Sequence, residues 1–556
     1  MLDELKKHHM SDTETVTDPV TGKKIPGVFV GVQHMHKLFK TSDTNLSGRG
    51  IEGPHDMDDA PSGSGFNGPK AIGGMEVNAL IAHNARSVLR ESTVLRGAKN
   101  AEFWKAFQAG QAPNFPAEKK TFNRFVDILK QAGINVTRQG DDLIAAPLTD
   151  KDILAMSSGE ISDGKMLFAK TLQPEPGGLF DPNITGGLKG TKWSHIKLVE
   201  PVVNPVFKDA AKSVLGMSTK EFDDASVNKG GKFIRDSLNA MNVQEELQKE
   251  KDALNSGNLT KGALDASLKR MKYLRALDEL HMKAGDAYML SVVPVTPPSV
   301  RPVVVGRTGD TMDNDANKLY QGLILQNNVF RKIKNSGMGE EDVRDNRRAI
   351  NERMAELTGM IAPSSPQMRG RGVKGAPDFI SGDVPKEGYF QKKVIYGKMN
   401  LTGRSTITPD ETVGLDEVGP PEKVAWEMYK PFLIRGLSQM GYTPLAAKEA
   451  VENRTDVARK VLQHELEKRP VIINRAPTLW RHGIMAAKPV LRADTNLHVN
   501  SLWESSLNLT TTVTPCRYIC LLRTKLSAMQ KKCSPRSSFS QIKRRTTCWK
   551  SLPGNR

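Results

Sequence analysis

The sequence RPVIINRAPTLWRHG, at residues 469–483, concentrates more informative residue types than any other part of this 556-residue chain. Its apolar run PVIIN is typical of a buried β-strand, and Pro477 ends that pattern because proline lacks the amide hydrogen that a strand ladder needs. Arg475 is therefore expected at a strand end, where its planar guanidinium could grip a ribose or a phosphate. Composition alone favours a plainer interpretation, in which Arg475 forms an ordinary salt bridge in a loop.

Short apolar runs of the strand type surround this stretch from residue 393 onward. They read KVIYG, STIT, KPVLR and LHVN, and one helical insert, Pro421 to Gln463, interrupts them. This pattern favours a β-structure, a small barrel, with inserted helices. Lys392, Lys393, Lys398 and Arg404 form a second basic cluster, for which solvated surface charge is the plainer interpretation.

Composition and charge restrict the class of protein. Hydrophobic residues make up 38% and charged residues 26%, which is globular, and the length allows about three to five domains. No run reaches the ~18 apolar residues of a membrane helix, and residues 1–10 lack an apolar signal core. We therefore expect a cytoplasmic protein without a membrane partner, and the net charge of +18 suggests a polyanionic one. Five histidines have no metal-like spacing and are read as core or surface residues: His34, His36, His195, His482 and His498.

The last 48 residues differ from the rest of the chain. Residues 509–556 hold 11 of the 80 Lys and Arg residues and none of the 62 Asp and Glu residues, which leaves a net charge of +7 on residues 1–508. All four cysteines, at 516, 520, 533 and 548, also lie there. The body therefore has neither a disulfide frame nor a cysteine-type zinc site.

Toward the N-terminus the pattern alternates between helices and glycine-rich loops. We expect a strand at Val28–Phe39, a helix at Met75–Leu89 and a linker at Ala109–Pro116. Amphipathic spacing predicts a helix pair on either side of residues 255–260. The remaining expectations are an extended connector at Pro294–Pro302, a helical hairpin formed by Ala316–Lys334 and Glu340–Leu357, and a basic loop at Ser364–Gly382.

A series of motifs, in the same order, resembles the N-terminal half of the beta-prime subunit of bacterial-type, multisubunit DNA-directed RNA polymerase. SGEI at 158–161 resembles the family's FGEV, GLFD at 178–181 its DGLF, SHIKL at 194–198 its GHIEL, and VPVTPPSVRP at 293–302 its LPVLPPDLRP. QNNVFRK at 326–332 resembles RNNRLKR, GK at 397–398 with GRS at 403–405 resembles GKR and SGRS, KPF at 430–432 resembles FKPF, and NRAPTL at 474–479 is the family's own string.

Residues 1–115 resemble the C-terminal end of the partner (beta) subunit. VGVQHMHKL at 30–38 is similar to that subunit's VGYMYMLKL, and GGMEVNAL at 73–80 to its GEMEVWAL. The order of the two resemblances implies a gene fusion, and a chain that opens inside beta implies a fragment or an upstream break.

The resemblance implies a mixed α/β, multidomain fold with a partial double-psi β-barrel, a helical clamp hairpin and mixed α+β regions. The implied domains are a beta C-terminal-like region at 1–115, a clamp-like region at 120–315, a clamp-helix hairpin at 316–360, a rudder-like loop at 361–392, the partial barrel at 393–508 and a tail at 509–556. In the family the hairpin docks an initiation (sigma) factor, and the rudder lies beside the RNA–DNA hybrid.

The implied activity is template-directed RNA synthesis, a nucleotidyl transfer that the family carries out with two Mg²⁺ ions. By the motifs, Arg475 and Asn508 would contact the nucleotide ribose, while Lys398 and Arg404 would hold the template or hybrid backbone. The implied partners are the DNA template, the RNA product, ribonucleoside triphosphates and other polymerase subunits.

Two departures from the family pattern stand out. Only residues 181–193, without a cysteine, fill the place of the four-cysteine zinc ribbon, a reduction that resembles the polymerases of large phages. Where the family reads NADFDGD, with three magnesium-binding aspartates, this chain reads NLTTTVT at 508–514. Threonine hydroxyls cannot replace three anionic oxygens around Mg²⁺, so no catalytic residue and no metal ligand are expected in this frame.

A reading frame displaced by one base accounts for the second departure. Codons GAC TAC GAC GGT GAC encode Asp-Tyr-Asp-Gly-Asp, and read one base later they give the TTTVT of residues 510–514. The same shift permits VQVHMP at 515–520 and LEVPT at 548–553, both similar to family strings. A displaced tail has no selected hydrophobic pattern and is expected not to pack into the body.

Three hypotheses follow. The chain is part of a transcribing polymerase, inactive as written because a frameshift removes the Asp triad. It is a non-catalytic split subunit that another chain completes. Or it is a basic nucleic-acid-binding protein with an authentic basic tail, unrelated to catalysis.

Overall fold

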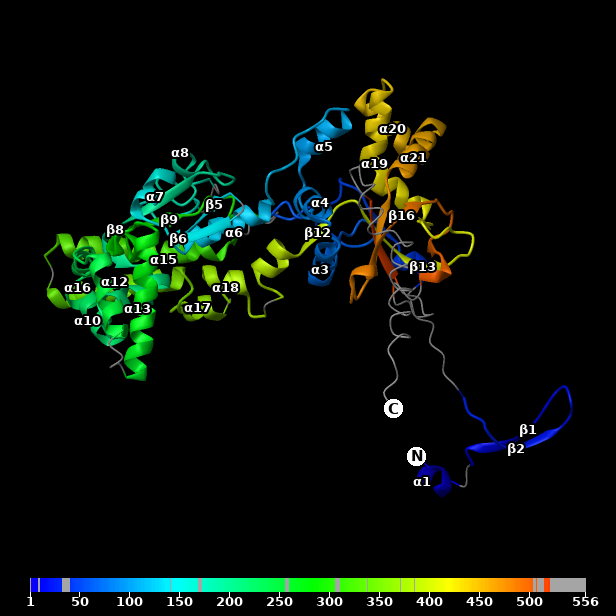
Figure 1. The fold of residues 1–556 in the computed structure, drawn as a ribbon, viewed down its shortest axis with the longest axis horizontal. Helices are drawn as coiled ribbons and strands as arrows, with labels where there is room; N and C mark the ends of the chain where they lie inside the picture. Colours follow the sequence, from blue (N-terminus) through cyan, green and yellow to red (C-terminus); the bar gives the residue numbers. More distant parts are fainter. Residues whose placement is uncertain are drawn as a thin grey trace.

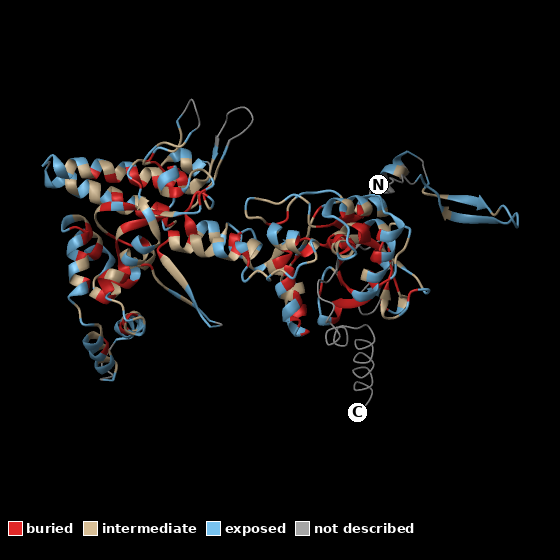
Figure 2. Cartoon of the chain, turned by 90° about the horizontal axis from the view of Figure 1, so that it is seen from above, coloured by how far each residue is buried: buried red, intermediate tan, exposed pale blue. Residues whose placement is uncertain are grey.

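The structure is a computed structural model that places most of the chain. It describes all residues except 1, 9–10, 33–40, 141, 169–172, 256–259, 306–310, 338, 371, 385, 504–506, 508–514 and 521–556. The described residues form a mixed α/β fold of two lobes, with α6 (Lys120–Gln131) between them (Figure 1). Figure 2 shows that buried residues concentrate inside both lobes, whereas the hairpin of β1 (Thr13–Thr17) and β2 (Lys24–Phe29) is largely exposed. None of the described helices is long and apolar enough to span a membrane.

A seven-stranded sheet organises the lobe that carries the NRAPTL motif. Its strands follow the order β14-β16-β15-β18-β13-β17, and β3 also pairs with β13. Neighbours are antiparallel except β13 with β17 and β14 with β16, which are parallel. The strands are β3 (Ser47–Arg49), β13 (Thr402–Pro409), β14 (Glu417–Val418), β15 (Val471–Arg475), β16 (Ile484–Pro489), β17 (Leu497–Val499) and β18 (Pro515–Cys520).

Helices cover both faces of this sheet because the central strands are apolar on both sides. Val471 and Ile473 of β15 belong to the core built on α19 (Glu422–Gln439). Ile472, between them, joins a second core with Leu80 and Val88 of the N-terminal helices. The covering helices are α3 (Gly74–Ala82), α4 (Arg86–Arg90), α5 (Ala101–Gln108), α19, α20 (Pro444–Glu452) and α21 (Asp456–Lys468).

The N-terminal region is built into the same lobe. Besides the β3–β13 pair, β4 (Lys70–Ile72) pairs antiparallel with β12 (Gly397–Met399). Arg49 at the end of β3 is fully buried, and its guanidinium donates to Asn400 Oδ1 at 2.7 Å and to the carbonyls of Pro54 and Ser62 at 2.7 and 2.8 Å. One buried arginine thus ties a glycine-rich loop of the first region to a loop between β12 and β13.

The other lobe places helices around the sheet β7-β8-β9. Burial of Ile196 and Tyr320 shows that its core joins the sheet to α15 (Asp315–Asn335), and Ile350 of α16 (Glu340–Leu357) belongs to the same core. Its elements are β5 (Ile134–Gln139), β6 (Asp142–Pro147), α7 (Asp150–Met156), β7 (Ser157–Glu160), α8 (Pro182–Thr185), β8 (Trp193–Val203), α9 (Lys208–Leu215), α10 (Thr219–Asn228), α11 (Gly231–Asn239), α12 (Val243–Asn255), α13 (Lys261–Glu279), α14 (Ala284–Tyr288), β9 (Met289–Val295), β10 (Val303–Val305), β11 (Thr311–Asp313), α15 (Asp315–Asn335), α16 (Glu340–Leu357), α17 (Pro366–Gly370) and α18 (Ala376–Ser381).

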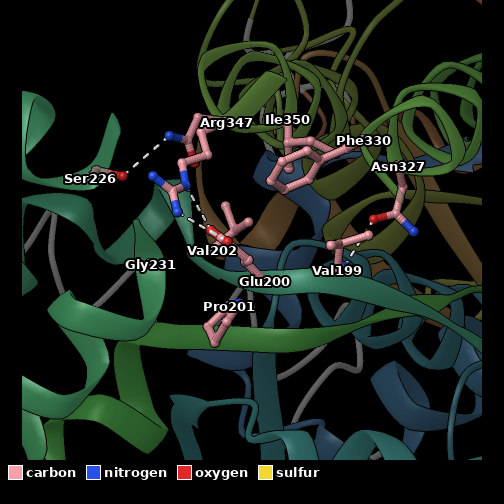
Figure 3. Close-up of a pocket in the computed structure, with 11 residues that line it drawn as sticks. Val199, Glu200, Pro201, Val202, Ser226, Gly231, Asn327, Phe330, Arg347 and Ile350 are labelled. Carbon is pink, nitrogen blue, oxygen red and sulfur yellow. Dashed lines mark hydrogen bonds and ion pairs between the residues drawn. The ribbon is translucent and has the colours of Figure 1, made fainter. Parts of the chain in front are cut away.

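Polar contacts fix the α15–α16 hairpin on β8 (Figure 3). Arg347 of α16 donates to both carboxylate oxygens of Glu200, at 2.8 and 3.1 Å, and Lys334 of α15 reaches the same carboxylate at 3.0 Å. Asn327 of α15 completes the β8 edge, because its side chain accepts from the Val199 amide and donates to the Lys197 carbonyl. Glu200, Asn327 and Arg347 line a cavity of only about 10 Å³, the lower limit for one water.

Several sequence expectations are confirmed. The hairpin predicted at 316–334 and 340–357 is α15 and α16, and the predicted amphipathic pair is α12 and α13. The helical insert at 421–463 is three helices, α19 to α21.

Other expectations are wrong in part. The helix predicted at 75–89 breaks at Asn84, whose φ of 54° lies in the left-handed region, so two helices form instead of one. The predicted loop at 364–382 contains α17 and α18. The run KVIYG lies mostly in a helical turn at Phe390–Ile395, because its apolar residues pack against α6 and not across a sheet. The strand predicted at 28–39 ends at Phe29 as β2, and residues 33–40 lie outside the described part.

The expectation that residues 509–556 stay clear of the body is wrong for β18. This strand pairs with both β13 and β15, and Tyr518 is only 1% exposed. The physical reason is that two apolar strand edges face each other there and need a partner for their amides and carbonyls. Residues 521–556 lie outside the described part of the chain.

Arg347→Ala should loosen the hairpin. Arg347 and Glu200 have side chains only 19% and 12% exposed, so the substitution leaves a poorly solvated carboxylate with one cation fewer. We expect the opening free energy of α16, measured by amide hydrogen exchange, to fall by about 1–3 kcal/mol. Arg344→Ala is the matched control, because its partner Glu340 is 91% exposed, and it should change the same quantity by less than about 0.5 kcal/mol. Equal effects of the two substitutions would contradict this assignment.

The stability difference between Arg347→Ala and the unsubstituted chain should depend on pH. Burial alone would raise the pKa of Glu200, but the hydrogen bonds and charges of Arg347 and Lys334 outweigh it and hold the pKa below the ordinary 4.5. A lowered folded-state pKa stabilises the fold above the unfolded value, and this contribution is lost as the pH falls through the folded value. The difference between Arg347→Ala and the unsubstituted chain should therefore shrink below pH 4.5.

Candidate functional site

The NRAPTL motif forms the end of β15 and the turn that follows it. Asn474 is 5% exposed, and its side chain donates to Glu76 Oε1 of α3 at 3.1 Å and accepts from Thr478 Oγ1 at 2.6 Å. Ala476 and Pro477 are joined by a cis peptide bond. The turn is therefore held from both sides, by its own Thr478 and by the helix from the N-terminal region.

Arg475 is the last residue of β15, as the sequence predicts. It is half-buried, and its Nε is buried without a hydrogen-bond partner among the described residues. No ion pair joins Arg475 to a carboxylate in the described ranges, so the loop salt bridge of the plainer interpretation is not formed there. In register, Arg475 lies opposite Cys516 of β18, and Cys516 lies opposite Ser405 of β13.

Arg404 lies in the same sheet but one row away. It pairs with Arg517 of β18, which pairs on its other side with Asn474. Because successive side chains of a strand point to opposite faces, Arg404 and Arg475 start from opposite faces of the sheet. The structure thus brings the two predicted arginines into one sheet without directing them to one point.

Of the other two predicted residues, the structure describes Lys398 but not Asn508. Lys398 is exposed on β12, opposite Ala71 of β4, on the ladder that joins the N-terminal region to the lobe. Asn508 lies outside the described residues.

The second basic cluster includes an ion-paired lysine that the sequence left as solvated charge. Lys393 pairs with Asp56 and, at 3.4 Å, with Asp58, and Arg124 of α6 also pairs with Asp58. Lys119 beside them is 8% exposed and donates to the carbonyls of residues 394 and 396 at 3.0 and 2.9 Å. Burial lowers the pKa of Lys119 to about 8. These contacts tie the acidic loop of the first region to the connection between the lobes.

Sequence reasoning missed the contribution of α3 to the site. Glu76 accepts from the Gly73 amide at 2.9 Å as a helix cap, and the other oxygen of its carboxylate holds Asn474. His83, just after the helix, contacts the Arg481 carbonyl at 2.6 Å, and burial lowers its pKa. The helix cap is readable in the string GGME, but nothing in the sequence pairs residue 76 with residue 474.

Comparison with known proteins is consistent with this geometry. No family model matches the chain. A DNA-directed RNA polymerase subunit beta' of Nitrosomonas eutropha is 33% identical over 279 residues, which are 49% of this chain and 19% of that subunit. The beta' subunit of Paraburkholderia phytofirmans is 33% identical over 274 residues, 48% of this chain and 19% of that subunit.

The chain is a relative of these bacterial beta' subunits. The beta' subunit of Nitrosospira multiformis aligns over 445 residues at 27% identity, which covers 66% of the chain and 31% of that subunit. The chain therefore spans between about a fifth and a third of the length of the relatives that it matches.

The magnesium that the polymerase family implies does not fit the residues of this beta' relative. Within the described ranges, no three His, Cys, Asp or Glu side chains gather as a metal site would require. Residues 508–514, where the resemblance would place the family's aspartates, read NLTTTVT, and hard divalent cations need anionic oxygen ligands.

Glu76→Ala should weaken the attachment of α3 to the NRAPTL turn. The substitution removes the acceptor of the Gly73 amide and of the buried Asn474 side chain, at about 1–3 kcal/mol for a buried donor left unpaired. Urea unfolding followed by circular dichroism should show this loss. Glu76→Gln keeps an amide oxygen as acceptor and should cost less, and Glu102→Ala on the exposed side of α5 should cost little. A loss for Glu102→Ala as large as for Glu76→Ala would contradict the role of Glu76.

Proposed function

We propose that this chain is part of a DNA-directed RNA polymerase and builds the support of its active centre from the end of a beta subunit and the N-terminal half of beta'. The observation that carries the proposal is the pairing of β3, from residues 1–115, with β13, the strand that holds the GRS motif. Two regions that resemble different subunits share one sheet around NRAPTL. The relationship to bacterial beta' subunits supports the same reading.

The sheet also supports a double-psi barrel as the proposed architecture. As a ladder it is open, with β14 and β17 at its ends. However, Gly419 after β14 and His498 of β17 exchange two backbone hydrogen bonds of 2.8 Å each. A single residue pair thus bridges the two ends, which is the contact that closing a sheet into a barrel requires.

Within this proposal the predicted residues have distinct tasks. Arg475 and Asn508 contact the nucleotide ribose, and the Nε of Arg475, which has no hydrogen-bond partner among the described residues, supports a ligand there. Lys398 and Arg404 hold the template or hybrid backbone. The α15–α16 hairpin docks an initiation factor, residues 361–392 lie beside the hybrid, and the protein works in the cytoplasm of a bacterial cell or a phage-infected host.

We further propose that the chain as written is catalytically incomplete. The string TTTVT at 510–514 has no carboxylate, and a one-base shift of the codons restores the family's aspartates. The genomic sequence around codon 508 tests this proposal. A shifted frame that continues with polymerase sequence supports a frameshift, whereas a stop followed by a new gene that opens at the aspartate loop supports a split subunit.

One observation favours the split subunit as a second candidate. Tyr518 is buried, and its hydroxyl is 2.9 Å from Ser405 Oγ, so a residue of the supposedly displaced frame packs with its polar atom satisfied. A basic protein unrelated to transcription is the third candidate, which the beta' relationship disfavours.

The chain as written should not extend RNA. The expected result with a primed RNA–DNA scaffold, Mg²⁺ and matching partner subunits is no added nucleotide, because a magnesium site needs anionic ligands that residues 508–514 do not supply. Primer extension on a denaturing gel measures it. The frame-corrected chain with the same partners is the control, and extension by the uncorrected chain would refute the proposal.

In the frame-corrected, reassembled enzyme, Arg475 should govern the choice of sugar. Arg475→Ala removes a donor to the ribose, so incorporation of ribonucleotides should fall more than that of 2′-deoxynucleotides, by about five- to a hundredfold for one lost charged hydrogen bond. Lys398→Ala removes an exposed cation that the proposal places on the nucleic-acid backbone, so it should weaken template binding for both substrates. The loss should be largest at low salt, because one phosphate contact fewer makes binding less sensitive to salt. Single-nucleotide extension with paired substrates measures both effects. If Arg475→Ala slows the incorporation of ribonucleotides and of 2′-deoxynucleotides equally, the proposed role in sugar choice is wrong, and Arg475 is an ordinary loop arginine.

A further inference from the structure

The strand slot is the space between β13 at Thr402–Thr406 and β15 at Val471–Arg475, which β18 fills. All five residues of each flanking stretch are in register with a residue of β18. No other described strand lies between the two, so without β18 the group β14-β16-β15 and the group around β13 stay linked only at the far end of the sheet, through the Gly419–His498 bridge. Each part would then present an unpaired edge of five residues.

The slot contains a socket that is specific for a large side chain. Tyr518 lies opposite Gly403 in the ladder, and a Cβ built on Gly403 would come within 2.3 Å of the Tyr518 ring and 2.8 Å of Val424 Cγ1. Glycine at 403 is therefore what makes room for the ring. Ser405, two residues along β13 and so on the same face, meets the Tyr518 hydroxyl at 2.9 Å.

The contacts that hold β18 are of the kind that a separate strand makes. Backbone hydrogen bonds on two sides supply affinity in strand addition, and pockets for alternate side chains supply specificity. Tyr518 lies in the main core of the lobe with Val424 and Ile473, so the anchor is apolar as well as hydrogen-bonded. None of these contacts needs a covalent connection between β17 and β18.

We propose that the strand slot is a binding site for a β-strand of a separate polypeptide, with the socket of Gly403, Ser405 and Val424 selecting an aromatic or large apolar side chain at the position of Tyr518. Residues 515–520 of this chain occupy the site in the structure. A split subunit would use the same site to receive the remainder of its sheet. Strand binding itself needs no polymerase activity, so its test and that of the proposed function fail separately.

The test uses the full chain, folded before it is cut. A protease recognition sequence is inserted between Thr511 and Thr512, and the purified chain is cleaved. Fragment 512–556 should then co-elute with the body on gel filtration. An excess of a synthetic peptide of residues 513–522, with Cys516→Ser and Cys520→Ser, should displace it. Release of the fragment on cleavage would overturn the proposal, and so would failure of the excess peptide to displace the retained fragment.

Two variants test the socket. Tyr518→Asp should release the fragment, while Tyr442→Asp, at a 38% exposed tyrosine between α19 and α20, should not. Retention of the Tyr518→Asp fragment would overturn the assignment of the socket.

A double-substitution cycle tests the hydroxyl contact without large changes in packing. Ser405→Ala should weaken binding of the tyrosine peptide by about three- to tenfold, the range for one neutral hydrogen bond. The same substitution should leave binding of a Tyr518→Phe peptide unchanged, because that peptide has no hydroxyl to lose. Equal weakening of both peptides would show that Ser405 acts on the fold of β13 and not on the bound strand.

Discussion

Strand β13 carries the hydrogen-bond ladder on which the rest of this structure depends. One edge of it binds β3 from the N-terminal region and then β17, and the other edge binds β18. Three segments that lie between about 90 and about 350 residues from β13 along the chain therefore meet on its eight residues of backbone. Because each strand satisfies the polar groups of its neighbour, the loss of any of them would leave unpaired amides and carbonyls next to an apolar core.

Buried polar groups extend this constraint to the candidate site. Arg49 fixes the loop before β13 through Asn400, and Glu76 fixes the NRAPTL turn through Asn474. In both pairs one partner comes from the first hundred residues and the other from residue 400 onward. The turn that follows Arg475 is therefore positioned by the N-terminal region as much as by its own strand.

The two lobes are connected through charge as well as through the chain. Lys393 and Arg124 both reach Asp58, and Lys119 is buried among backbone carbonyls beside them. Partly buried pairs of this kind are weakened by salt less than surface pairs are. The geometry of the connection therefore rests on ionic contacts made by an acidic loop of the N-terminal region.

Local patterns in the sequence were enough for the helices and for several strands. Repeats of 3.6 residues predicted α12, α13, α15 and α16. The apolar run PVIIN, followed by Pro477, predicted that β15 ends at Arg475. The motif order alone led to the relationship with bacterial beta' subunits. Tertiary structure alone decided that Glu76 holds Asn474, that Arg404 and Arg475 start from opposite faces, and that Tyr518 fills a socket over Gly403. The reason is that a local pattern records periodicity and breaks, whereas strand order, register and long-range partners depend on which edges and buried polar groups are left to be satisfied once the chain has folded.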